Sequence, residues 1–238
     1  EGWTRLWEGD LPGAEAALAL ARSIERRFGG NPPLSDGCER LETTLLSVTG
    51  HGQQALQRVA ALVETFAGSA NADLSIAYAK AYLHGYARTA WACADHAAFR
   101  SIAPRAMQPR RPGEWVSIGI SSRMLPAQLA LLDRDWAAAA DILESVLAEH
   151  EPALFPLGHA DPRLCLAHAR LQQGRAADAL TALERVLAQC VGERAIGCLL
   201  LEPDWLVAPL LELLPRERRT EPPPAPLLGR LADCRAHA

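Results

Sequence analysis

The stretch LQQGRAADALTALERVL, from Leu171 to Leu187, decides the fold. It contains the end of one helix, a break at Gly174 and most of a second helix. On the second helix, Ala179 and Leu183 lie four residues apart and therefore share a face. Alanine permits a close approach there, and leucine fills the space beside it. The segment predicts two helices packed as a hairpin.

The same outline recurs about forty residues earlier as LLDRDWAAAADILESVL, from Leu131 to Leu147. The two copies match at Leu131/Leu171, Ala139/Ala179, Leu143/Leu183, Glu144/Glu184 and Val146/Val186. Weaker copies are LWEGDLPGAEAALALA (Gly9, Ala14, Leu18, Ala21), VTGHGQQALQRVAALV (Gly50, Ala55, Val59) and WACADHAAFRSIA (Ala98, Ile102). Repetition at this period predicts an all-α fold, an α-solenoid of about five degenerate helical hairpins with a C-terminal capping helix.

Glycine, proline and aspartate mark the ends of the expected helices. The predicted helix pairs are 3–8 with 10–28, 35–49 with 52–67, a pair that begins near Asp73, 115–133 with 136–149, and 162–173 with 176–190. Asp10, Asp161 and Asp204 are expected helix caps. We expect a repeat domain over 1–215. Residues 216–238 would form a proline-rich linker and a terminal helix leading toward a C-terminal domain that this fragment lacks.

Composition excludes several classes of protein. The 238 residues carry a net charge of −4 with both signs scattered, so we expect no nucleic-acid-binding face. No apolar run reaches the roughly 18 residues of a membrane span, and no signal peptide is visible. The six cysteines have neither CxxC pairs nor framework spacing, which is typical of reduced core residues in a cytoplasmic protein.

No catalytic or metal-binding motif is visible. There is no GxSxG, no phosphate-binding loop and no HExxH, and Lys80 is the only lysine. His159 and Asp161 could form a ligand pair, but a loop before a helix cap explains them as well. The sequence therefore predicts neither enzyme activity nor a metal site, and no cofactor in this fragment. The loop from Met107 to Gly113 could dock a partner, although a solvated linker explains it better.

All three tyrosines of the chain, Tyr78, Tyr82 and Tyr86, recur at a spacing of four on one expected helix. Positions four apart form a nearly straight stripe. Packing against neighbouring helices is the favoured explanation. The alternative is that the stripe lines a concave groove and offers hydroxyl groups to a ligand.

Three consecutive segments carry a family resemblance: LLDRDWAAAADILESVL (131–147), DPRLCLAHARLQQGRAADALTALERVL (161–187) and CLLLEPDWLVAPLLELLP (198–215). The hairpins resemble degenerate tetratricopeptide repeats. In their order, the segments resemble the end of the sensor region in large LuxR-type transcription regulators of the MalT-like class. In that class an ATPase module precedes the helical repeats, and a helix-turn-helix DNA-binding domain follows them.

The resemblance implies a domain that receives a small-molecule inducer or a protein or peptide effector and passes the signal to neighbouring domains. The candidate ligand-binding residues are Tyr78, Tyr82 and Tyr86, with Arg40, Arg123 and His168 as polar partners from adjacent hairpins. The competing interpretation is a free-standing scaffold of the tetratricopeptide type whose groove binds a peptide or protein.

Overall fold

The computed structural model describes residues 1–28, 32–67, 72–107, 116–150, 161–214 and 225–236. In these ranges the chain is all-α and contains no strand. The helices are α1 (Gly2–Glu8), α2 (Leu11–Phe28), α3 (Pro32–Val48), α4 (Gly52–Ala67), α5 (Ala72–Ala92), α6 (His96–Ala106), α7 (Val116–Leu132), α8 (Trp136–His150), α9 (Pro162–Gln172), α10 (Ala176–Glu193), α11 (Gly197–Leu200), α12 (Asp204–Glu212) and α14 (Ala225–Ala236).

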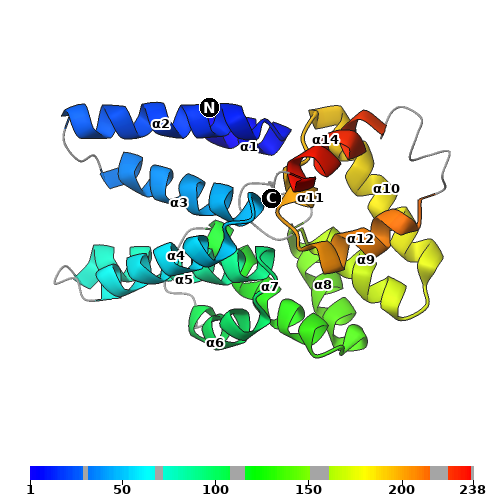
Figure 1. The fold of residues 1–238 in the computed structure, drawn as a ribbon. Coiled ribbons are helices and arrows are strands. Elements are labelled where there is room, and N and C mark those ends of the chain that lie inside the picture. Colours follow the sequence, from blue (N-terminus) through cyan, green and yellow to red (C-terminus); the bar gives the residue numbers. More distant parts are fainter. Residues whose placement is uncertain (29–31, 68–71, 108–115, 151–160, 215–224, 237–238) are drawn as a thin grey trace.

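Helices that follow one another in the chain pack side by side, from α1 on α2 to α9 on α10 (Figure 1). One continuous apolar core extends from Leu6 in α1 to Cys234 in α14. The alanines predicted to permit close helix packing, Ala14, Ala55, Ala139 and Ala179, are fully buried. All six cysteines are free, and all but Cys93 are buried, in agreement with their predicted place in the core.

The same turn joins the two helices of each of five successive pairs in the described chain. Its central residue has a positive φ and is Gly9 (81°), Gly50 (76°), Ala94 (53°), Arg134 (61°) or Gly174 (79°) in these pairs, and the turn recurs at Arg194 (54°) between α10 and α11. The next residue's amide donates at 2.8–2.9 Å to the carbonyl five residues earlier, as from Arg175 to Arg170. This is the bond that satisfies free carbonyls at a helix C-terminus. Glycine suits the left-handed conformation because it has no Cβ.

Two sequence expectations need correction. The copy in WACADHAAFRSIA was expected to place Ala98 and Ile102 at the repeat positions. Counted from the left-handed turn residue Ala94, those positions hold Phe99 and Ala103, one residue later. The expected cap Asp204 is the first residue of α12, and its carboxylate pairs with Arg235 at 2.9 Å rather than capping the helix. The caps Asp10 and Asp161 are confirmed, because their side chains accept from the amides of Gly13 and Arg163.

The last helices return to the first one, so the two ends of the described chain meet (Figure 1). The amide of Ile196 donates to the carbonyl of Trp7 at 2.8 Å. Gly197 lies so close to the Trp7 ring that an added Cβ would stand 2.0 Å from Cε3. From α14, Arg230 donates to the carbonyl of Glu8 at 3.0 Å. We call this contact between α1, α11 and α14 the seam.

Several predicted features lie outside the described residues. They are the loop 108–113, His159 and the proline-rich segment 222–224, together with the side chain of Tyr78, whose backbone belongs to α5. Among the described helices, none has both the length and the apolar character that a bilayer crossing requires.

Candidate functional site

A row of aromatic rings runs across four helices that are distant in sequence. Measured between ring centroids, Trp136 at the start of α8 lies 5.9 Å from His168 of α9, and His168 lies 5.3 Å from Trp205 of α12. Trp205 in turn lies 5.7 Å from His96 at the start of α6. All three pairs are edge-on, an arrangement favoured by the quadrupoles of aromatic rings.

These rings form one wall of a cavity of about 590 Å³. A volume of this size suits a small organic ligand. The cavity is lined by His96, Leu131, Leu132, Arg134, Trp136, His168, Gln172, Trp205 and Pro209. Helices α6, α7, α8, α9 and α12 all contribute, so a bound molecule would touch several helical pairs at once. We call this the aromatic cavity.

The aromatic cavity has few polar groups, and the hydrogen bonding of His168 and Trp205 can be described. His168 is buried, and burial lowers its pKa, so the ring is neutral at neutral pH. Its Nδ1 lies 3.2 Å from the carbonyl oxygen of Leu206, which can only accept, so Nδ1 carries the proton and Nε2 keeps a lone pair. The indole Nε1 of Trp205 is buried without a hydrogen-bond partner among the described residues.

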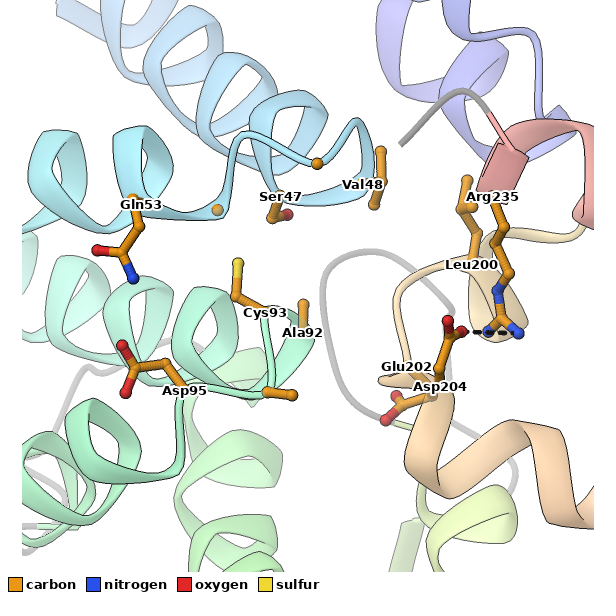
Figure 2. A pocket seen from close by; sticks show the side chains of 13 residues that line it. Ser47, Val48, Gln53, Ala92, Cys93, Asp95, Leu200, Glu202, Asp204 and Arg235 are labelled. Carbon is orange, nitrogen blue, oxygen red and sulfur yellow. Dashed lines mark ion pairs between the residues drawn. The ribbon is translucent and has the colours of Figure 1, made fainter.

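A second cavity of about 440 Å³ lies between the turns of the second and third helix pairs and the C-terminal helices (Figure 2). Figure 2 shows Gln53, Cys93 and Asp95 on one side and Leu200, Glu202, Asp204 and Arg235 on the other. Burial raises the pKa of the Cys93 thiol to about 11, so the sulfur stays protonated at neutral pH. A protonated thiol is a poor nucleophile, and this cavity therefore offers no activated cysteine.

Glu202 is the most unusual titratable group in this region. Its carboxylate accepts from the indole Nε1–H of Trp91 at 2.7 Å and from the amide of Asp161 at 2.9 Å. The guanidinium of Arg88 lies 3.6 Å away. Complete burial nevertheless raises the Glu202 pKa to about 7, because desolvation outweighs the attraction of Arg88. The residue joins α5, α12 and the start of α9.

The structure does not bring the six sequence-predicted ligand residues together. Tyr82 is only 3% exposed, packs on Val59 and Val63, and hydrogen-bonds Asp36 through its hydroxyl. The pKa of the Tyr82 hydroxyl is raised, mainly by burial and secondly by the hydrogen bond to Asp36. Tyr86 is partly buried against the core. Neither tyrosine lines either of the two cavities.

The other three candidates lie in separate places. Arg40 pairs with Asp36 at 3.1 Å, so it meets Tyr82 through a shared carboxylate. Arg123 pairs with Glu149 at 2.7 Å on α7 and α8. His168 alone of the six lines the aromatic cavity. Its role as a ligand-binding residue stays a prediction, now with different neighbours.

Sequence reasoning missed Trp136, Trp205 and His96. A usable signal was present, because Trp136 follows the turn residue Arg134 by two positions and His96 follows Ala94 by two. The two rings follow their turn residues at the same interval, and both line the aromatic cavity.

No protein-family model matches the chain, no curated protein is significantly similar to it, and no solved structure resembles it significantly.

Proposed function

We propose that the chain is an effector-binding module built of degenerate tetratricopeptide-like hairpins, and that it serves a MalT-like LuxR-type transcription regulator in the cytoplasm. The aromatic cavity, with rings from α6, α8, α9 and α12, is the observation that carries the effector-binding role. The repeat interpretation rests on the five equivalent turns, which recur at intervals of 41, 44, 40 and 40 residues. The regulator assignment rests on the sequence resemblance, and the module itself carries out no catalytic step.

The position of the aromatic cavity suggests how binding is transmitted. Trp205 belongs to α12, and the short segment before α12 includes α11, which contacts α1 at the seam. A ligand held between α12 and the hairpins would stabilise the closed arrangement over an open one. Ligand binding shifts a conformational equilibrium only by the difference in affinity between the two states. Neighbouring domains of the regulator would sense that shift.

The test is a small-molecule fragment screen by ligand-observed NMR with the full 238-residue chain. We expect fragments that bind the wild type and lose binding in Trp136→Ala. The matched control is Trp3→Ala, because Trp3 is also partly buried against the core but does not line the aromatic cavity. Absence of any fragment with this pattern would contradict the proposed function.

The scaffold alternative also has an observation in its favour. Leu20, Ile24 and Phe28 on α2 are exposed by 59%, 42% and 74% and lie on one face at a spacing of four. Such a stripe could pack against an apolar face of a partner helix. Replacing the three residues by glutamine would abolish partner binding in that case and leave fragment binding unchanged.

A further inference from the structure

Among the described residues that line the aromatic cavity, Arg134 is the only one with a permanent charge. The carboxylates on either side of it are already engaged. Asp133 pairs with Arg100, and Asp135 accepts from the amide of Ala138 at 3.1 Å, capping α8. Within the described chain, Arg134 itself forms neither a hydrogen bond through its side chain nor an ion pair. Its positive charge is therefore available to a ligand.

The backbone at Arg134 shows how its side chain can be removed without loss of the turn. Its φ is 61°, in the left-handed region, where Gly9, Gly50 and Gly174 occupy the equivalent position of three other turns. A side chain is disfavoured in this conformation because its Cβ approaches the following carbonyl oxygen. Ala94 shows that the turn tolerates a Cβ. Arg194 also adopts this conformation, with φ 54°, away from the cavity, so the assignment of Arg134 rests on its place in the cavity lining, and glycine at position 134 should preserve the turn.

The aromatic cavity supplies the rest of the recognition. Trp136, His168 and Trp205 offer ring surfaces, and His168 is neutral, so it adds no second positive charge at neutral pH. Within the described part of the chain, the lining of the cavity includes no carboxylate that would repel an anion. A guanidinium binds a carboxylate through two parallel hydrogen bonds, and its single charge matches a single negative charge.

We propose that the aromatic cavity binds a planar aromatic carboxylate, with its ring among Trp136, His168 and Trp205 and its carboxylate on Arg134. The inference rests on the proposed function and specifies the chemistry of the effector. It assigns recognition of the ring to the interior of the cavity and recognition of the charge to the turn between α7 and α8.

The test compares acids with their neutral amides. Benzoate, naphthalene-2-carboxylate and indole-3-carboxylate, each with its primary amide, are titrated by calorimetry into the 238-residue chain at pH 7. We expect at least one acid to bind about tenfold or more tightly than its amide, since a hydrogen bond between two charged groups is stronger than one to a neutral amide. That preference should shrink at high salt, because Arg134 is exposed.

Arg134→Gly is the decisive variant, because it removes the charge and relieves the backbone. It should bind acid and amide equally and should melt at the same temperature as the wild type or higher. Arg134→Lys should keep part of the preference. The matched control is Arg194→Gly, since Arg194 is also left-handed, with φ 54°, and does not line the aromatic cavity. It should leave the preference unchanged.

The inference is overturned if no acid binds more tightly than its amide, or if Arg134→Gly retains the preference. Its failure can be separated from failure of the proposed function. If other fragments bind in a way that depends on Trp136, the effector-binding role stands and the carboxylate assignment falls. If no fragment and no acid binds, both fall.

Discussion

The indole Nε1–H of Trp91, on α5, donates to Oε2 of Glu202 at 2.7 Å, across 111 residues of chain. This bond fixes the segment that begins α12 against the third pair of helices. It also lies between the two cavities, since Glu202 lines the second one and Trp91 contacts Trp205 of the aromatic cavity at 5.3 Å between ring centroids. Changes at Glu202 should therefore affect the whole C-terminal half of the structure.

The raised pKa of Glu202 predicts a pH-dependent stability. In the folded protein the Glu202 carboxyl keeps its proton up to about pH 7. In the unfolded chain the same carboxyl loses its proton near the ordinary pKa of 4.5. The folded state thus binds more protons in that window, and the free energy of unfolding falls as pH rises from about 4.5 to 7. For a shift of this size the fall amounts to roughly 3 kcal/mol.

Glu202→Gln should remove this contribution. The free energy of unfolding of the wild type and of Glu202→Gln is measured in urea at several pH values between 4.5 and 8. The readout is the difference between the two proteins in the slope of this free energy against pH. His168 acts in the opposite direction, because its lowered pKa makes the unfolded chain the stronger proton binder, but it is common to both proteins. Identical pH slopes would show that Glu202 is ionised throughout the range.

A methyl group at the seam should be costly. In Gly197→Ala the new Cβ would stand 2.0 Å from Cε3 and 2.3 Å from Cδ2 of Trp7. Overpacking of this kind costs about 1–3 kcal/mol, so we expect the urea midpoint to fall. Gly192→Ala is the matched control, because nothing lies within 4 Å of its added Cβ. It should be neutral or stabilise α10 by up to about 1 kcal/mol. Equal effects of the two substitutions would contradict the close packing of the seam.

Tyr82→Phe separates the two interpretations of the tyrosine stripe. Loss of the hydroxyl removes a hydrogen bond to Asp36, so the free energy of unfolding should fall by about 1 kcal/mol. Binding of the aromatic acids should be unchanged, because Tyr82 does not line the aromatic cavity. The opposite pattern, weaker binding with unchanged melting, would restore the ligand-groove hypothesis.

The helix caps should behave as equivalent parts of a repeat. Asp95 accepts from the amide of Ala98 at 2.9 Å, and Asp135 accepts from that of Ala138 at 3.1 Å. Each substitution by alanine should cost about 1 kcal/mol in thermal unfolding, and serine should recover most of the loss. A difference of several kcal/mol between the two sites would argue against their equivalence.

The helices were largely predictable because alanine and leucine stripes and local turn residues determine them. The expected helix 52–67 agrees with α4 (Gly52–Ala67), and 136–149 differs from α8 (Trp136–His150) by one residue. One error arose where the turn residue was alanine. At Ala94 the side chain gives no sign of a left-handed conformation, so the third repeat was aligned one residue too early.

The site was less predictable because its residues come from distant helices. A spacing of four marks a face of a helix equally well whether that face meets a groove or the core, and Tyr82 proved to face the core. His168 was singled out as a polar partner for tyrosines, whereas its ring neighbours are Trp136 and Trp205. No local pattern in the sequence connects three rings on α8, α9 and α12.

The seam has a consequence for the order in which the chain folds. Most helix contacts join neighbours in sequence and can form early and independently, while the bond from Ile196 to Trp7 joins residues about 190 positions apart. Closing a loop of that length is entropically unfavourable until the intervening hairpins are folded. The seam should therefore be the last contact to form on the folding pathway.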